Sequence, residues 1–225
     1  MSTTEPIYLI EPAEPTADEA RNTIGGRPIL AAGQDWPECH CGLRMIFFFQ
    51  LAVPDDVPAF GGDHLLVFQC PKDNDACFPP ATPQLPDRYW DEPPPPNDRP
   101  FWRILIHRGG DPHPDADPYL QPRSLVLRRT TEAVNEYGNG TRAFKVGGTP
   151  SWAQDPERYR CACGADLTFL CQVPEDHEFD TLPGQEEQPG WYRSNNYALF
   201  LGNEVYILAC PAHCHPSAAW PVNQN

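Results

Sequence analysis

The sequence predicts a mostly β protein, an α+β chain with little helix, in which two pseudo-symmetric β-rich repeats pack as one body. Three observations lead to this prediction. The 225 residues include 29 Pro and 16 Gly, a content that interrupts long helices and favours turns. The apolar runs are short enough to be strands rather than helices. A long segment of the chain also occurs twice.

The duplication is gap-free over 27 positions at a spacing of 122 residues. Residues 24–50 read IGGRPILAAGQDWPECHCGLRMIFFFQ, and residues 146–172 read VGGTPSWAQDPERYRCACGADLTFLCQ. Both copies contain Gly-Gly-x-Pro, which marks a sharp bend of the backbone, then Cys-x-Cys-Gly, an apolar run and a glutamine. We therefore expect a single duplicated domain over residues 1–225. Its parts are repeat one (22–78), a proline-rich connection (79–100), central strands (101–140), repeat two (141–216) and a frayed tail (217–225).

The individual elements follow from apolar runs and turn residues. Continuous apolar runs, which are typical of strands buried on both faces, predict the strands. They cover residues 7–10, 45–51, 64–68, 101–107, 124–129, 197–201 and 204–208. Gly202-Asn203 between the last two predicts a hairpin. Two short helices are expected, at residues 16–21 from a capping-box spacing and at residues 130–137 ahead of a glycine.

Eight of the nine cysteines fall into two equivalent sets of four. Each set consists of a Cys-x-Cys pair, a cysteine at the end of an apolar strand and one more cysteine shortly after it. A tetrahedral zinc site needs four such soft donors from two points of the chain. We therefore predict two structural zinc ions, held by Cys39, Cys41, Cys70 and Cys77 and by Cys161, Cys163, Cys210 and Cys214.

Three alternatives remain open at these cysteines. One site alone could form, or the thiols could be free and buried, or His213 or His215 could replace Cys214 as the fourth ligand. Cys171 stands inside an apolar run and is interpreted as a small core residue. Four protein ligands leave no open position for water, so we expect these sites to stabilise the fold rather than catalyse a reaction.

The balance of charge limits the classes of partner. The chain carries 31 acidic against 16 basic side chains, a net charge of −15, which repels nucleic acid and favours a basic protein or peptide, or serves solubility alone. No apolar stretch is long enough to span a membrane, and the first residues lack the pattern of a signal peptide. Patterned cysteines then indicate metal in a reducing compartment, so we expect a cytoplasmic protein.

The duplicated pattern resembles the YwqG-like family, also grouped as the TYPP domain. The resemblance is clearest over residues 146–214, which contain Val-Gly-Gly-Thr-Pro-Ser-Trp at 146–152, then Gln154, Cys161, Cys163, Phe169-Leu170 and Gln172. The first copy departs from it where Ile29-Leu30 replaces Ser-Trp, and the proline-rich middle does not match. The resemblance implies a duplicated, mostly β unit whose halves form one body. Eukaryotic relatives escort a nascent ribosomal protein, and some bacterial members are suspected immunity proteins.

The expected function is therefore a non-catalytic, zinc-stabilised protein- or peptide-binding module with an escort or chaperone-like role. Candidate binding residues are Gln50, Gln172, Trp152 and the glycines Gly25, Gly26, Gly147 and Gly148. Equally, both glutamines could satisfy buried backbone groups.

Two alternatives to this function stay open. One is an immunity protein that neutralises a toxin. The other is an enzyme whose site lies in the acidic loops. It would use His107, His113 or His177 beside Asp111, Asp115, Asp117, Asp176 and Glu178.

Overall fold

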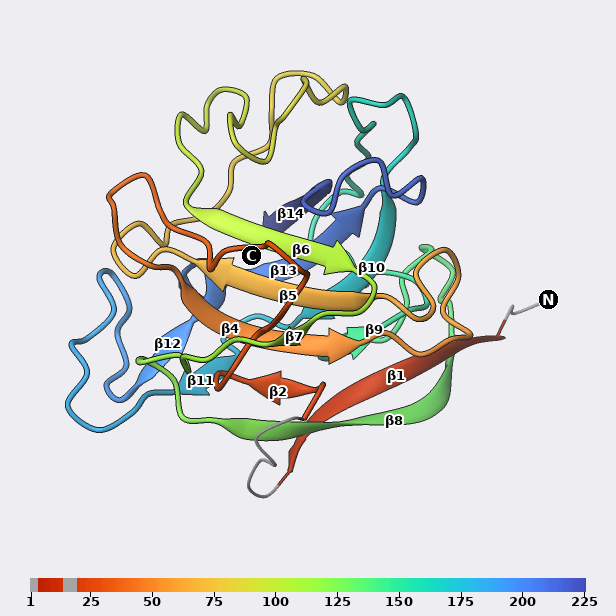
Figure 1. Ribbon diagram of the computed structural model, residues 1–225. Coiled ribbons are helices and arrows are strands. Elements are labelled where there is room, and N and C mark those ends of the chain that lie inside the picture. The colour runs from red at the N-terminus through yellow and green to blue at the C-terminus, as the bar shows by residue number, and fades with distance from the viewer. Residues whose placement is uncertain (1–3, 14–19) are drawn as a thin grey trace.

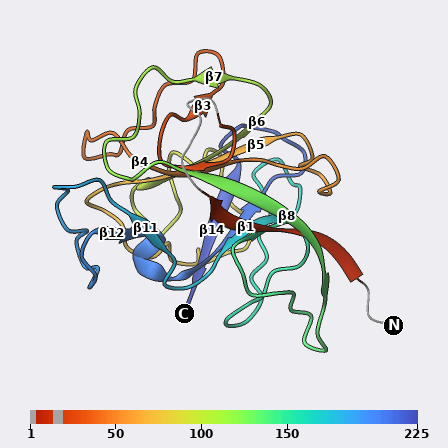
Figure 2. The same ribbon diagram turned by 90° about the horizontal axis from the view of Figure 1, so that it is seen from below.

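The computed structural model describes residues 4–13 and 20–225, and one large antiparallel sheet dominates it (Figure 1). Within these residues the sheet has ten strands. In spatial order they are β14 (Ala219–Gln224), β13 (Glu204–Ala209), β10 (Thr168–Val173), β9 (Lys145–Val146), β1 (Thr4–Ala13), β8 (Arg123–Ala133), β2 (Thr23–Ile24), β4 (Ile46–Ala52), β5 (His64–Gln69) and β6 (Trp102–His107). The two longest, β1 and β8, pair along their whole length at the middle of the sheet, as Figure 2 shows from below.

Two small ribbons complete the secondary structure. They pair β3 (Ile29–Leu30) with β7 (Asp111–Pro112) and β11 (Glu178–Asp180) with β12 (Asn196–Ala198). The described residues contain no α-helix and only one 3₁₀ turn, η1 (Leu199–Gly202), so the mostly β prediction is confirmed. The helix predicted at residues 130–137 is wrong, because its first part belongs to β8. Most of the helix predicted at residues 16–21 lies outside the described residues.

The same backbone hydrogen bonds recur 122 residues apart. The amide of Gly25 donates to Phe48 O and that of Gly147 to Leu170 O, at 3.1 and 2.9 Å. The pairing of β4 with β5 shifts register after Phe47, and that of β10 with β13 shifts after Phe169. These hydrogen bonds and register shifts therefore occur at equivalent positions of the two duplicated segments.

The core lies around strands that are buried on both faces, as their continuous apolar runs predict. All six residues of β5 and of β13 are buried, and in β4 the three consecutive rings of Phe47, Phe48 and Phe49 are fully buried. Aromatic edge-to-face contacts join the large sheet to the small ribbons. Phe48 on β4 contacts Phe179 on β11, for example, with ring centroids 5.0 Å apart.

The proline-rich connection leaves the sheet and forms the loops at the top of Figure 1. It is nevertheless anchored to the core, since Tyr89 is fully buried and contacts the ring of Trp220.

A buried ion pair fixes the turn that begins the second copy. Lys145 Nζ on β9 lies 2.6 Å from a carboxylate oxygen of Glu132 on β8, and both side chains are fully buried. The carboxylate also accepts hydrogen bonds from the amides of Thr141 and Thr149, each at 2.6 Å. A Cβ on Gly148 would lie 2.1 Å from the same carboxylate, which explains why glycine is needed at this bend.

Two predictions near the C-terminus are wrong. β12 and β13 do not form a hairpin across Gly202-Asn203, because Phe200 and Leu201 take left-handed φ values of 48° and 50° and turn the chain away. The frayed tail is instead the strand β14, which pairs with β13 along its full length. Burial of the large indole of Trp220 (1% exposed) stabilises this strand.

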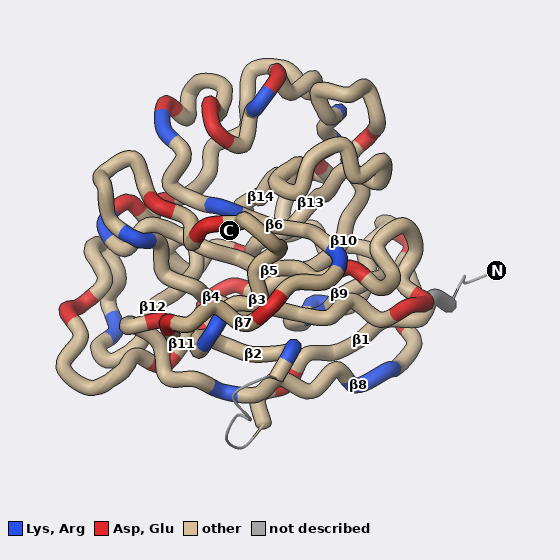
Figure 3. The backbone as a smooth tube through the Cα atoms, viewed as in Figure 1, with Lys and Arg blue, Asp and Glu red and all other residues tan. Residues whose placement is uncertain are grey.

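The sheet curls until its end strands approach each other. The amide of Ile106 on β6 donates to Pro216 O, just before β14. The rings of Trp102 on β6 and Trp220 on β14 also contact each other, with centroids 5.6 Å apart. Charged residues of both signs are distributed over loops and strand ends rather than gathered on one face (Figure 3). Among the described residues, no helix is long and apolar enough to cross a membrane.

Candidate metal centres and the groove between them

The second cysteine set forms one compact cluster. Cys161 and Cys163 lie in a tight turn before β10, while Cys210 and Cys214 follow the end of β13. Their four Sγ atoms all lie within 4.8 Å of one another, with Cys161 and Cys214 at 3.4 Å and Cys163 and Cys210 at 3.5 Å. The four residues predicted from the sequence therefore meet at one point.

The first set brings only three of its four cysteines together. Cys39, Cys41 and Cys70 form a cluster under the same 4.8 Å limit, with Cys41 and Cys70 at 3.6 Å. The backbone around the two Cys-x-Cys turns is the same, since Cys39 N donates to Leu43 O and Cys161 N to Ala165 O, both at 2.8 Å.

Cys77 is not part of the first cluster, and its prediction as a ligand is wrong. Its thiol is buried and faces Phe78 O at 3.9 Å, and its amide donates to Asn223 Oδ1 on β14. Burial raises the pKa of this thiol, which is the behaviour of a neutral core cysteine. The longer spacing from Cys70 allows the chain to pass the cluster before Cys77 is reached.

His213 is likewise not a ligand of the second cluster. Its Nε2 lies 2.6 Å from Asp63 Oδ2, and Arg108 Nε donates to the other oxygen of the same carboxylate at 2.9 Å. Asp63 is 1% exposed, so these two groups satisfy a buried carboxylate. The imidazole thus links the end of β13 to the loop before β5.

Backbone amides point at three of the sulfur atoms and act to lower their pKa, although burial still leaves the pKa of Cys70 raised. The amide of Ala165 holds the pKa of Cys163 at about 7. Burial acts to raise the pKa of Cys41, but the amide of Leu43 and the neighbouring thiols outweigh it, so this pKa is also lowered. Lys72 N and Asp73 N donate to Cys70 Sγ at 3.5 and 3.3 Å. Such donors offset negative charge on metal-bound sulfur.

The geometry of both clusters fits a thiolate-bound metal ion. Four sulfur atoms about 2.3 Å from a central zinc ion would lie about 3.8 Å from one another. The observed separations of 3.4 to 3.6 Å are slightly shorter than this and far longer than a disulfide bond. All nine cysteines are free thiols. The two clusters could therefore each hold a metal ion.

The glutamines predicted as binding residues serve the fold. Gln50 Oε1 accepts from Ile29 N at 2.8 Å, and Gln172 Oε1 accepts from Ser151 N at 3.0 Å. Both glutamines are fully buried, so each amide pins the segment after Gly-Gly-x-Pro rather than facing a partner.

The other predicted binding residues are also used internally. Trp152 is half-buried against Tyr206, with ring centroids 4.4 Å apart. Gly25, Gly26, Gly147 and Gly148 have positive φ. A Cβ on Gly25 would press on Leu120 at 3.2 Å. These glycines therefore shape the two bends.

The histidines of the acidic loops lie apart and in different surroundings. His107 Nδ1 faces Gly109 O at 3.0 Å, and His113 Nδ1 accepts from Asp115 N at 3.1 Å. His177 lies between aromatic rings, where burial lowers its pKa to about 4. The carboxylate of Asp117 accepts three backbone amides, from residues 47, 119 and 120, which is a structural use.

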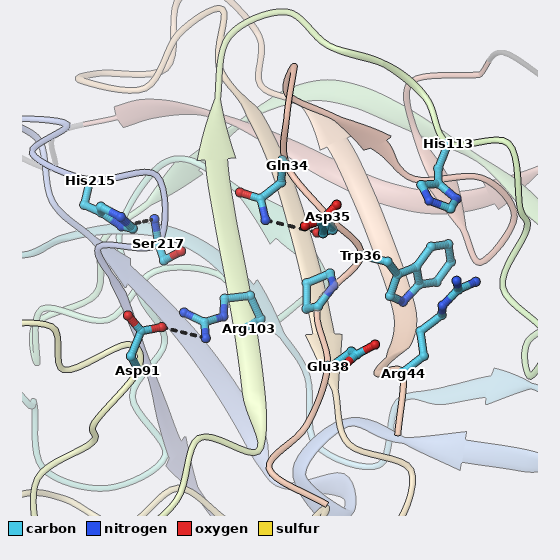
Figure 4. Close-up of a pocket in the computed structure, with 11 residues that line it drawn as sticks. Gln34, Asp35, Trp36, Glu38, Arg44, Asp91, Arg103, His113, His215 and Ser217 are labelled. Carbon is cyan, nitrogen blue, oxygen red and sulfur yellow. Dashed lines mark hydrogen bonds and ion pairs between the residues drawn. The ribbon is translucent and has the colours of Figure 1, made fainter. Parts of the chain in front are cut away.

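A groove of about 630 Å³ is lined by residues that adjoin both cysteine clusters in the sequence. One wall is the segment from Gln34 to Glu38, which leads directly into Cys39, and the opposite wall contains His215 and Ser217, just after Cys214 (Figure 4). Arg103 on β6 lies on the floor and pairs with Asp91 at 2.9 Å. A neighbouring cavity of about 450 Å³, which contains Asp63 and His213, shares His215 with the groove.

Sequence reasoning missed this groove, because its residues come from six separate places in the chain that only the fold brings together. The guanidinium carbon of Arg44 lies 5.0 Å from the centroid of the Trp36 ring, and the ring centroids of Trp36 and His113 are 5.2 Å apart. The available signal was the Trp-Pro-Glu run immediately before Cys39. No family model matches the chain, and no curated protein matches it either.

Proposed function

We propose that this chain is a non-catalytic binding protein, stabilised by two zinc ions, whose groove takes a basic, extended segment of a protein partner. Clusters of thiolates alone favour zinc over harder divalent ions, which supports the identity of the metal. Nine free thiols support a reducing compartment such as the cytoplasm. The resemblance to the YwqG-like family, whose relatives escort a protein, is consistent with binding.

One observation carries the proposal: the groove holds unpaired acidic groups. Arg44 and Arg103 are each neutralised, by Asp115 at 3.0 Å and by Asp91 at 2.9 Å. Asp35 and Glu38, both exposed, have no ion-pair partner within the part of the chain that the structure describes. The charge left for a ligand is therefore negative, in a protein whose net charge is already −15.

The metal clusters position the walls of this groove. Glu38 directly precedes Cys39, and His215 directly follows Cys214. His215 is further held by stacking on Trp90, with ring centroids 4.2 Å apart and an interplanar angle of 7°. Each wall is thus one residue away from a thiolate cluster, so metal binding would order the surface that contacts the partner.

The test compares two fluorescent peptides of equal length, one rich in lysine and arginine and one rich in aspartate and glutamate, by anisotropy at low and high salt. We expect the basic peptide to bind and the acidic peptide not to bind. Replacement of both Asp35→Asn and Glu38→Gln should weaken binding about tenfold.

The matched control is Glu136→Gln with Asp155→Asn, which removes the same charge from exposed positions outside the groove. This control should bind the basic peptide almost as well as the unmodified protein. Equal losses in the two variants would contradict a groove site, because they would show attraction by net charge alone. The same assay applies to an immunity role, since a toxin would occupy the same groove.

A further inference from the structure

The two cysteine clusters differ in the position of one ligand. Cys214 lies four residues after Cys210, whereas the residue four after Cys70 is Asn74. Asn74 is buried, and its Nδ2 donates to Pro189 O at 3.0 Å. Cys77 lies elsewhere, so the first cluster has three sulfur atoms where the second has four.

One side of the first cluster, at Cys41, is exposed to solvent. In the second cluster the fourth sulfur, that of Cys214, lies 3.4 Å from Cys161 and belongs to an exposed residue. The turn of Cys39 has the same backbone hydrogen bond as the turn of Cys161, so these two cysteines occupy equivalent positions. Cys41, in the same turn as Cys39, is exposed. A ligand from outside the chain can therefore approach the first cluster from the side of Cys41.

His40 lies close enough to the first cluster to be considered as a fourth ligand. Its Nδ1 lies 3.3 Å from Cys39 Sγ. It is nevertheless absent from the group whose ligand atoms all lie within 4.8 Å of one another, and its Nε2 faces Asp73 at 3.7 Å. The imidazole therefore does not converge with the three sulfurs on one point.

We propose that the first cluster binds its metal ion through Cys39, Cys41 and Cys70 alone and leaves a fourth coordination position that an external neutral nitrogen base of the imidazole class can occupy in place of water. This proposal rests on metal binding as stated in the proposed function. Sites with three protein ligands keep such an open position, whereas the second cluster is closed.

The charge of the site favours a neutral ligand. Three thiolates and one divalent ion leave a net negative charge, and the surrounding chain is acidic, so a further anion is repelled. Imidazole is neutral and a good donor for divalent first-row ions. The same thiolates reduce the ion's power to acidify water, which favours ligand exchange over hydrolysis as the role of this position.

The experiment uses the full chain loaded with cobalt(II), whose visible spectrum reports the ligands, and titrates it with imidazole. We expect two cobalt ions per chain and a saturable change in the ligand-field bands of one of them. Asn74→Cys supplies a thiol at the spacing found in the second cluster. It should abolish the response and add thiolate-to-cobalt charge-transfer absorption.

Two further variants make the result unambiguous. His40→Ala should leave the spectrum and the response unchanged; a changed spectrum before imidazole is added would identify His40 as the fourth ligand and overturn the proposal. Cys214→Ala opens the second cluster, so both ions should respond, which provides the test if Asn74→Cys does not fold.

Two outcomes separate the proposals. Two bound cobalt ions without any response to imidazole would overturn the open position and leave the metal-stabilised fold intact. Binding of a single cobalt ion would instead show that three thiolates do not suffice, which contradicts the two-metal fold itself.

Discussion

The imidazole of His177 lies between two phenylalanine rings, with centroids 5.0 Å from Phe144 and 4.9 Å from Phe179. Its Nε2 is buried and has no hydrogen-bond partner among the described residues. Burial lowers the pKa of this histidine from 6.5 to about 4, because the charged form loses its hydration. The side chain is therefore a half-buried aromatic ring whose neutral form the fold favours.

Replacement of His177→Phe should flatten the acid side of the stability profile. Between pH 6.5 and 4 the unfolded chain binds a proton at this position and the folded chain does not, so stability is complete above pH 6.5 and falls as the pH is lowered. Between these two pH values, the free energy of unfolding of the original protein should fall by up to about 1.4 kcal/mol per pH unit through this histidine, and the variant should lack that contribution. Urea unfolding at a series of pH values measures it. Identical slopes for both proteins would contradict the assignment, and His113→Gln serves as the control.

Cys70 and Cys77 offer a matched pair of buried cysteines, one inside the cluster and one outside it. Cys77→Ala should keep two metal ions per chain and cost about 1 kcal/mol through a small cavity. Cys70→Ser leaves two thiolates in the first cluster, so it should lose one ion. The metal content of each purified variant tests these expectations. Loss of an ion from Cys77→Ala would show that Cys77 is a ligand after all.

At the scale of elements, the pair of Glu132 and Lys145 connects β8 to β9 near the middle of the sheet. Glu132 accepts hydrogen bonds from two amides as well as from the ammonium, so its charge is well compensated only while Lys145 is present. Removal of one partner from a buried pair leaves a charge in a poorly polarisable interior, which costs more than removal of both.

We therefore expect Lys145→Met to destabilise the protein by about 3–5 kcal/mol. The double variant with Glu132→Gln should recover part of this loss, since no buried charge is then left unpaired. Chemical denaturation of the two variants and the original protein measures the difference. A double variant that is less stable than Lys145→Met would show that the pair is not coupled in this way.

The sequence predicted elements well where a run of residues was buried on both faces, and poorly where tertiary contacts decided. The apolar run that became β4 could be recognised because all three of its phenylalanines pack in the core. Residues 130–137 looked helical in isolation, but pairing with β1 makes their first part strand. The tail looked frayed because the pairing that orders β14 comes from β13 and from burial of Trp220, neither of which a local pattern reveals.

At the scale of the whole molecule, the sheet order places β2, β4 and β5 on one side of the central β1–β8 pair and β9, β10 and β13 on the other. Hydrogen bonds that recur at a spacing of 122 residues lie in these two halves. The same local hydrogen bonds therefore occur on both sides of the central pair. Seven of the eight cysteines predicted as ligands lie in the two clusters, and the duplication in the sequence revealed their order.

The remaining features of the site could not be read from the sequence. Cys77 fits the order of the cysteines but not their geometry, since loop length alone decides whether a thiol returns to the cluster. The negative charge of the groove depends on two ion pairs. Asp115 neutralises Arg44, and Asp91 neutralises Arg103. In each pair the two residues come from different segments of the chain. Ion pairs between separate segments are a property of the fold.

The most direct test of the account is the metal content of the full chain, purified without chelators or added metal, by elemental analysis combined with native mass spectrometry. The account predicts two zinc ions per chain and a fold that loses stability when a strong chelator removes them. A chain that is equally stable without any metal, or whose clustered cysteines are joined as disulfides, would contradict it.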